Sequence, residues 1–362
     1  MTGVLCVGVV GTSWWTENFH LAGLASHPRA ELVAVCGRNR DRAVAVAERH
    51  GQPRVFTDYG TMITSGLLDA VIVATPDDLH HDITMTAVDA GLHVLCEKPL
   101  ARSSEDAHHM LDAAEAAGLV HMVMFTWRWL GVFSYLKQLL ANGYIGRCRD
   151  ARFIMQADYA MDPDYGWRFD PARGSGILGD SGSHMIDLAR WYLGEVVQVS
   201  AQLTSHVSRP NPGGGTVSSL DDTAMLLLEF AAGARATLDL SAVRMVGEIP
   251  IQRVSLYGDQ GSLEADQDGG EAHLRGRRRA DSSWQHLPIP ADLLGLDGHR
   301  SPILDIPLLA PLTNLQVGDR LFVDAALGNA RAEPTFEDGW QAQRVVDAAI
   351  IANRERCWVP VT

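Results

Sequence analysis

The first 125 residues alternate short, uninterrupted apolar runs with amphipathic segments, and this alternation constrains the fold more than any other feature of the chain. The apolar runs are Leu5–Val10, Glu31–Cys36, Ala70–Ala74, His93–Cys96 and Val120–Phe125. Helical patterns fall between them, near 15–26, 41–50, 80–90 and 103–117. Strands without regular polar positions are buried on both faces, as in a parallel sheet covered by helices. We therefore predict an α/β fold with a doubly wound Rossmann domain over residues 1–126, whose ligand lies beyond the carboxyl ends of the strands.

After residue 127 the pattern becomes that of an antiparallel sheet. In Thr223–Phe230, and again in Arg235–Leu240, every second side chain is apolar and points to the same face of a strand. Gly233 lies in the turn between the two segments. A period of two on both sides of a turn predicts a hairpin. A closing helix follows Thr335, with Asp338 as its acidic cap partner. We predict an α+β domain over residues 127–362 with a largely antiparallel, open-faced sheet.

Charge and cysteine content exclude several classes of protein. The 362 residues carry 30 Lys and Arg against 44 Asp and Glu, a formal net charge of −14. We therefore expect no nucleic-acid partner and no anionic membrane surface, since both require clustered cations. The five cysteines never form a CxxC motif, which argues against a zinc ribbon or redox site. The first apolar run is too short to span a membrane, so we expect a soluble, cytoplasmic protein.

The turn after the first strand has the composition of a dinucleotide site. Gly11 lets the backbone approach a pyrophosphate, which then lies on the N–H groups that open the next helix. Ser13 and Thr16 occupy the second and third glycine positions of the full fingerprint. An ordinary strand-to-helix turn would look similar, so this segment alone leaves both interpretations open.

The end of the second strand bears on which dinucleotide is bound. An NAD site usually has Asp or Glu here, for the ribose 2′-hydroxyl. This chain has Cys36-Gly37-Arg38-Asn39 instead. Arg38 could pair with a 2′-phosphate, which favours NADP(H) and leaves NAD(H) possible. The alternative is that Arg38 is a solvated residue at a helix start.

A lysine follows the fourth apolar run, in Cys96-Glu97-Lys98-Pro99. A partly desolvated lysine has a lowered pKa and can exchange a proton with an alcohol or carbonyl oxygen. A single lysine is ordinarily a surface residue, so its interpretation depends on a second motif. That motif is Gly179–Asp187, in which Asp180 and His184 are four residues apart.

Asp180 and His184 can share one face of a first helical turn. A carboxylate beside an imidazole fixes its tautomer and raises its basicity, as a general base requires. His184 could instead cap a helix, or join Asp180 and Asp187 in a metal site. No further His or Cys clusters with them, and we predict no metal.

Together these motifs resemble the Gfo/Idh/MocA family, the glucose–fructose oxidoreductase and inositol dehydrogenase group, over essentially the whole chain. The resemblance rests on the following segments: Gly8–Trp15, Ala74-Thr75-Pro76 with His80, Glu97-Lys98-Pro99, Gly179–Asp187, Tyr257–Leu263 and Glu337-Asp338-Gly339. It implies that Lys98, Asp180 and His184 are catalytic and act at the substrate carbinol.

The resemblance and the motifs together give a set of predicted contacts. Cofactor contacts are expected from Gly11, Thr12, Ser13, Trp14, Trp15, Arg38, Asn39, Thr75, Pro76, His80, Glu97, Lys98 and Arg168. Substrate contacts are expected from Lys98, Arg128, Trp167, Asp180 and His184. For Arg128, Trp167 and Arg168, a structural ion pair or core packing is an equally open interpretation.

The predicted activity is that of an NAD(P)-dependent dehydrogenase or reductase. It transfers a hydride between nicotinamide and a secondary alcohol or ketone of a sugar, cyclitol or sugar derivative. Two alternatives stay open: an NAD-dependent glycoside-cleaving enzyme with transient redox, and a non-catalytic dinucleotide-binding regulator. A free sheet face further predicts a homo-dimer or homo-tetramer assembled through the second domain.

Overall fold

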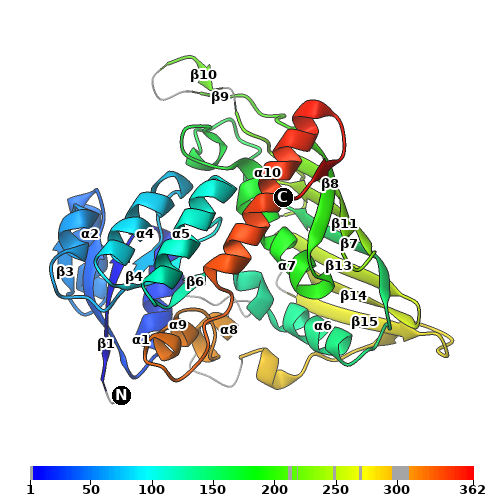
Figure 1. Ribbon diagram of the computed structural model, residues 1–362, viewed down its shortest axis with the longest axis horizontal. Coiled ribbons are helices and arrows are strands. Elements are labelled where there is room, and N and C mark those ends of the chain that lie inside the picture. The colour runs from blue at the N-terminus through cyan, green and yellow to red at the C-terminus, as the bar shows by residue number, and fades with distance from the viewer. Residues whose placement is uncertain (1–2, 211–213, 218, 248–249, 269–270, 296–309) are drawn as a thin grey trace. The chain divides into compact units, whose positions relative to one another are not determined.

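The computed structural model describes residues 3–210, 214–217, 219–247, 250–268, 271–295 and 310–362 (Figure 1). The chain forms two compact units. One comprises Met1–Thr126 with Gly295–Trp340, and the other Trp127–Leu294 with Gln341–Thr362. Gly295 and the described residues 310–340 thus belong to the first unit, although the sequence pattern grouped them with the second. Their helices α8 (Ala310–Asn314) and α9 (Gly318–Ala326) pack on α1 (Ala22–Ala25), a contact that no local pattern encodes.

The first unit is built on a six-stranded sheet in the order β3-β2-β1-β4-β5-β6, with every neighbouring pair parallel. Its strands are β1 (Leu5–Val10), β2 (Ala30–Cys36), β3 (Arg54–Phe56), β4 (Ala70–Val73), β5 (His93–Cys96) and β6 (His121–Val123). The predicted Rossmann fold is confirmed. The order reverses between β1 and β4, which is where such sheets bind ligands. The sequence pattern missed β3, because three residues that begin with an exposed arginine form no apolar run.

Helices join these strands, and side-chain caps begin several of them. They are η1 (Thr16–Leu21), α1, α2 (Arg40–Arg49), α3 (Tyr59–Ile63), η2 (Asp77–Leu79), α4 (His80–Asp89) and α5 (Ser104–Ala116). Asn39, Asp58 and Ser103 each accept a hydrogen bond from a backbone N–H three residues on. Each cap satisfies a donor that a helix start would otherwise leave unpaired.

The second unit contains a nine-stranded sheet in the order β16-β15-β14-β13-β7-β12-β11-β8-β17 (Figure 1). Its strands are β7 (Cys148–Gln156), β8 (Val196–Thr204), β11 (Thr223–Phe230), β12 (Arg235–Ser241), β13 (Ile251–Gly258), β14 (Gly261–Asp268), β15 (Glu271–Arg278), β16 (Gln285–His286) and β17 (Val359–Pro360). The pairing of β7 with β12 is parallel and the other pairings are antiparallel, so the predicted largely antiparallel sheet is confirmed.

One face of this sheet is buried and the other is open. Along β11 the side chain of Leu226 is 2% exposed and that of Leu227 is 48% exposed. Helices α6 (Gly131–Ala141) and α7 (Ser183–Leu193) pack on the buried face, against β14 and β7 respectively. The remaining short helical turns are η3 (Thr126–Trp129), η4 (Trp167–Phe169), η5 (Leu178–Gly182) and η6 (Ala291–Leu293). A separate two-stranded ribbon pairs β9 (Arg209–Pro210) with β10 (Thr216–Val217).

The closing helix α10 (Phe336–Glu355) begins as the sequence predicts. The backbone N–H of Thr335 donates to Asp338 at 2.9 Å, the reciprocal half of a capping box. In the described parts of the chain, no helix is both long and apolar enough to cross a membrane.

Candidate active site

The turn after β1 has a backbone shape that requires glycine. Gly11 has φ +141°, and a Cβ built there would lie 2.3 Å from the carbonyl oxygen of Ala74, which follows β4. The first glycine of the sequence motif therefore lets the β1 and β4 turns approach each other at the switch point of the sheet. The Ser13 hydroxyl accepts from the Thr16 N–H at 3.1 Å, so serine here closes the turn that begins η1. A glycine-opened helix start of this kind fits a dinucleotide pyrophosphate.

The two tryptophans of this turn have different surroundings. Trp14 is 54% exposed, whereas the Trp15 ring stacks on Phe19 with centroids 3.8 Å apart. The Trp15 Nε1–H donates to Glu97 Oε1 at 2.5 Å. Trp15 therefore links the β1 turn to the β5 turn that carries Lys98, whereas Trp14 stays largely exposed.

At the end of β2, Arg38 is exposed and Asn39 caps α2. The Asn39 Oδ1 accepts from the Arg42 N–H at 3.0 Å, so this oxygen serves the helix start. Thr12 packs on Gly37, where a Cβ would lie 2.6 Å from the threonine methyl carbon. The turns after β1 and β2 are thus in direct contact, with Arg38 on the surface beside them.

His80 is fully buried, and its ring nitrogens lie 3.0 Å from the Thr75 carbonyl oxygen and 2.8 Å from that of Pro99. Two carbonyl acceptors require two N–H donors, which only the imidazolium form supplies. Burial alone would lower the pKa of His80, but Cys96, Asp77 and the Pro99 carbonyl raise it to about 10. His80 therefore joins the turns after β4 and β5 through hydrogen bonds to both. A direct cofactor contact by His80, which the sequence predicts, does not fit this burial.

Thr75 and Pro76 follow β4 and are half-buried, and Lys98 follows β5 with a half-buried side chain. Glu97 is 7% exposed. Its Oε2 accepts from the Lys98 backbone N–H at 3.1 Å. The carboxylate therefore holds the backbone of the residue that the sequence predicts to be catalytic.

In the second unit Asp180 lies on the π-helical turn η5, and His184 on α7 directly after it. Such turns recur at functional sites because they interrupt the regular helical register. Asp180 Oδ2 accepts from the Tyr159 hydroxyl and from Arg168 Nε, both at 3.1 Å. Arg168 also lies over the Trp167 ring, 4.6 Å from its centroid. Asp180, Tyr159, Arg168 and Trp167 thus form one polar and aromatic cluster.

His184 is 5% exposed, and its ring stacks on Trp127 with centroids 4.4 Å apart and an interplanar angle of 12°. This contact fixes the plane of the imidazole. The orientation of His184 by Asp180 stays a prediction.

Arg128 has a structural environment. It is 4% exposed, and its Nε and Nη2 donate to the two carboxylate oxygens of Asp187 at 2.7 and 2.5 Å. The guanidinium also lies 5.5 Å from the Trp191 ring centroid. This geometry favours the ion-pair interpretation of Arg128 over a substrate contact, and it gives Asp187 a partner other than a metal. No group of three or more His, Cys, Asp or Glu within the described ranges is arranged to hold a metal ion.

Three residues of these clusters escaped the sequence analysis. Tyr159 lies in a segment without a motif, while His20 lies within hydrogen-bond distance of both Glu97 and Asp319. Asp319 is more than 200 positions from Glu97, so only the folded chain reveals that they share a partner. Of the residues that the sequence predicts to be catalytic, Lys98 lies in the first unit, and Asp180 and His184 lie in the second.

Comparison with known proteins agrees with this division. Residues 5–125 match the model described as "Oxidoreductase family, NAD-binding Rossmann fold", and residues 133–264 match the "GFO/IDH/MocA C-terminal domain". The chain is 29% identical to levoglucosan dehydrogenase of Pseudarthrobacter phenanthrenivorans, covering 99% of this chain and 98% of that one. It is 32% identical to 1,5-anhydro-D-fructose reductase of Ensifer adhaerens, covering 71% of this chain and 74% of that one.

The fold is also similar to that of solved structures. Levoglucosan dehydrogenase in complex with NADH and levoglucosan superposes with a TM-score of 0.86 at 26% identity, over 99% of each chain. An oxidoreductase domain protein from Kribbella flavida gives a TM-score of 0.88 at 28% identity, over 100% of each chain.

Proposed function

Because the chain belongs to the Gfo/Idh/MocA family of oxidoreductases, we propose that it transfers a hydride between a nicotinamide dinucleotide and a sugar, cyclitol or sugar derivative. The reacting group is a secondary alcohol or its ketone. The observation that carries the proposal is that a chain similar over its whole length to levoglucosan dehydrogenase also has acid–base groups at Lys98 and His184. A regulator that only binds a dinucleotide has no need of those two groups.

The residues of the first unit fit a dinucleotide. The backbone after Gly11, with Thr12, Ser13 and the exposed face of Trp14, would hold the pyrophosphate side. Thr75, Pro76 and Lys98, at the ends of β4 and β5, would line the nicotinamide side. When bound, the nicotinamide supplies the hydride chemistry.

The protein's own part is proton transfer and charge stabilisation. In the oxidative direction His184 takes the substrate hydroxyl proton, while its ring is held flat by Trp127. Asp180 stabilises the positive charge that forms on the ring, and Tyr159 and Arg168 hold Asp180 in place. The Lys98 ammonium stabilises the negative charge that develops on the substrate oxygen.

The experiment is steady-state kinetics on a panel of sugars, nucleotide sugars and cyclitols, read at the reduced-nicotinamide absorbance. Lys98→Ala and His184→Ala should each lower kcat by roughly 10²–10⁴-fold, the usual contribution of one acid–base group. Cofactor affinity, measured by fluorescence quenching, should survive. Unchanged kcat in both variants would remove these residues from the mechanism, and cofactor binding without turnover on the whole panel would favour a regulator.

The cofactor preference is a finer proposal, in favour of NADP(H) over NAD(H). It is supported by the exposed Arg38 and by the lack of a carboxylate among residues 36–39. Arg38→Ala should weaken NADP(H) roughly 10–100-fold, as expected for a lost charged hydrogen bond, and NAD(H) little. The exposed Arg54 on β3 supplies a control, Arg54→Ala, which should change neither affinity. Equal losses for both cofactors in Arg38→Ala would count against the preference.

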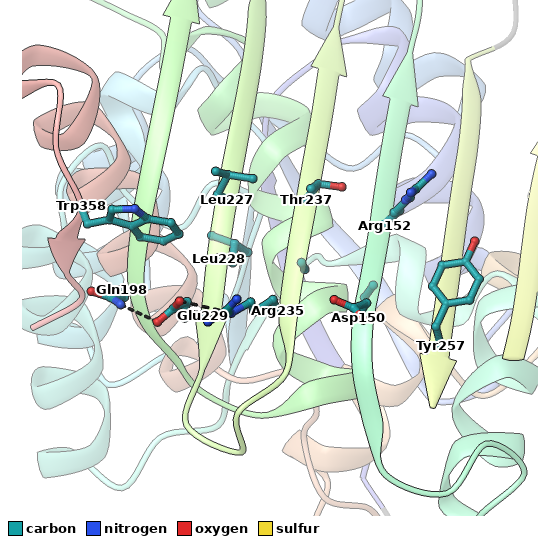
Figure 2. A pocket seen from close by; sticks show the side chains of 12 residues that line it. Asp150, Arg152, Gln198, Leu227, Leu228, Glu229, Arg235, Thr237, Tyr257 and Trp358 are labelled. Carbon is teal, nitrogen blue, oxygen red and sulfur yellow. Dashed lines mark hydrogen bonds and ion pairs between the residues drawn. The ribbon is translucent and has the colours of Figure 1, made fainter. Parts of the chain in front are cut away.

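We further propose that the open face of the second unit's sheet pairs with a second copy of this chain. A pocket lies on this face, and Figure 2 shows the side chains that line it, among them Trp358, Leu227, Arg235, Arg152 and Tyr257. Its volume is about 720 Å³. Met225 and Leu227 on β11, Val197 on β8 and Trp358 directly before β17 are each 43–48% exposed. Exposed apolar side chains grouped in this way are typical of an interaction surface.

A further inference from the structure

A buried chain of three ionisable side chains runs through the first unit to the turn that carries Lys98. His20, on η1, is fully buried; Asp319, on α9, is 1% exposed, and Glu97 is 7% exposed. His20 Nδ1 lies 2.8 Å from Asp319 Oδ1, and its Nε2 lies 3.1 Å from Glu97 Oε1. Both ring nitrogens therefore face carboxylate oxygens.

This arrangement fixes the charge of the cluster. Two ionised carboxylates can only accept, so a ring bonded to both of them is an imidazolium. Burial raises the pKa of Asp319, and the charge on His20 opposes that rise. Burial alone would lower the pKa of His20, but Asp319 and Glu97 outweigh it and raise that pKa to about 10. Burial in turn raises the pKa of Glu97, but His20 and Lys98 outweigh it, so the pKa of Glu97 is lowered. Glu97 is thus ionised because His20 is charged.

The surrounding structure is shaped to keep this chain in place. Gly23 leaves room for Asp319, since a Cβ there would lie 2.8 Å from Asp319 Oδ2. Glu97 uses both oxygens: Oε1 accepts from Trp15 and His20, and Oε2 accepts from the Lys98 N–H. A buried charge left unpaired is costly, so loss of His20 should cause Glu97 to take up a proton and to weaken its hydrogen bond to the Lys98 backbone.

We propose that His20 and Asp319 are positioning residues for the hydride-transfer reaction: Asp319 holds a charged His20, which keeps Glu97 ionised and bonded to the backbone of Lys98. This inference rests on the proposed function, in which Lys98 acts at the substrate oxygen. Neither residue contacts substrate; each acts through Glu97. The charged groups that face Glu97 are His20 from η1, Lys98 on the same turn and, beyond His20, Asp319 from α9.

The test is the pH profile of kcat for His20→Gln and Asp319→Asn. In His20→Gln the cation is gone, so Glu97 should take up a proton near neutral pH and release its bond to Lys98. We expect kcat to fall roughly 10–100-fold near pH 7, the usual cost of losing an outer hydrogen-bond partner, and to recover as the pH rises. Asp319→Asn should show the same change, smaller in size.

The matched controls are His27→Gln and Asp324→Asn. His27 and Asp324 also form a histidine–aspartate pair, with Nε2 and Oδ1 3.4 Å apart, and Asp324 lies on α9. Among the described contacts, neither has a hydrogen bond to Glu97. Their pH profiles should match the wild type. A loss in His20→Gln that is equal at every pH would show a merely structural role and overturn the proposal, as would an unchanged kcat.

A second measurement does not depend on turnover. Nitrogen-15 NMR of the imidazole groups in the full chain, assigned with His20→Gln, should show His20 with both nitrogens protonated at pH 8. A neutral His20 ring at that pH overturns the inference whatever the enzyme turns over. If the wild type oxidises nothing in the substrate panel but His20 is an imidazolium, the proposed function fails and the charged chain to Glu97 stands.

Discussion

Arg128 and Asp187 show how much a single buried charge pair depends on its partner. Both were selected from sequence for possible chemistry, as a substrate contact and as a possible metal ligand. In the folded chain they are 4% and 1% exposed and joined by two hydrogen bonds. Their residue types identified them as candidates, whereas their burial determines what they do.

Removing one member of this pair should destabilise the second unit strongly. Arg128→Met should lower the free energy of unfolding by about 3–5 kcal/mol, since it leaves the Asp187 carboxylate buried without its cation. Urea unfolding followed by tryptophan fluorescence measures this. Arg128→Met combined with Asp187→Leu should recover part of the loss, because both charges are then absent. A loss under about 1 kcal/mol in the single variant would contradict a buried pair.

Asp221 should make stability depend on pH. Its Oδ2 accepts from the Leu178 N–H at 2.9 Å, at the start of η5. Burial raises its pKa to about 7, so the folded state keeps a proton that the unfolded chain releases near pH 4. The unfolded state binds fewer protons between these values, and the free energy of unfolding therefore falls as the pH rises from about 4 to 7.

Asp221→Asn keeps an acceptor for Leu178 and removes the titration. Its free energy of unfolding should exceed that of the wild type by more at pH 8 than at pH 5, measured by urea unfolding at both. The exposed Asp292 on η6 gives the control, Asp292→Asn, whose difference from wild type should not change with pH. If the free energy of unfolding changed with pH equally in the wild type and in Asp221→Asn, Asp221 would not be the group that makes stability depend on pH.

At the scale of elements, periodicity located five of the six strands of the first sheet and the β11–β12 hairpin of the second, and a few positions set how the elements join. The runs at 5–10 and 93–96 became β1 and β5 with the same bounds, because a continuous apolar run has a buried parallel strand as its natural outcome. Strand β8 was missed, since its exposed and half-buried residues do not alternate cleanly. The β1 turn needs Gly11 for a tertiary reason, the carbonyl of Ala74.

Gly11→Ala should therefore do more than strain one backbone angle. A methyl group 2.3 Å from the Ala74 oxygen forces the β1 and β4 turns apart, so stability should fall by roughly 1–3 kcal/mol and dinucleotide affinity should drop sharply. Thermal unfolding and fluorescence quenching measure the two effects. The comparison is Gly66→Ala: Gly66 also has positive φ, +71°, but nothing within 4 Å of its Cβ position. Gly66→Ala should lower stability without lowering dinucleotide affinity. Equal losses of dinucleotide affinity in the two variants would contradict the argument from the Ala74 contact.

At the scale of the whole molecule, the alternation in β11 and β12 leaves one sheet face uncovered in a single chain. Leu227→Lys should place a charge in the centre of the proposed contact with a second copy and shift the assembly toward monomer. Sedimentation velocity measures the change. Met245→Lys, at an 81% exposed position in the loop after β12, should leave the assembly unchanged. A monomeric wild type would end the proposal of a second copy on this face.

The sequence by itself determined the two kinds of sheet, the glycine turn and the motifs at Lys98 and His184, because periodicity and backbone constraints are local properties. The tertiary structure decided which side chains are buried together: His80 beneath its two turns, Arg128 on Asp187, and His20 between Glu97 and Asp319. It also assigned the described residues 310–340 to the first unit. The physical reason is that the charge state and hydrogen bonding of a polar group depend on neighbours brought together by folding, and their spacing along the chain carries no trace of that contact.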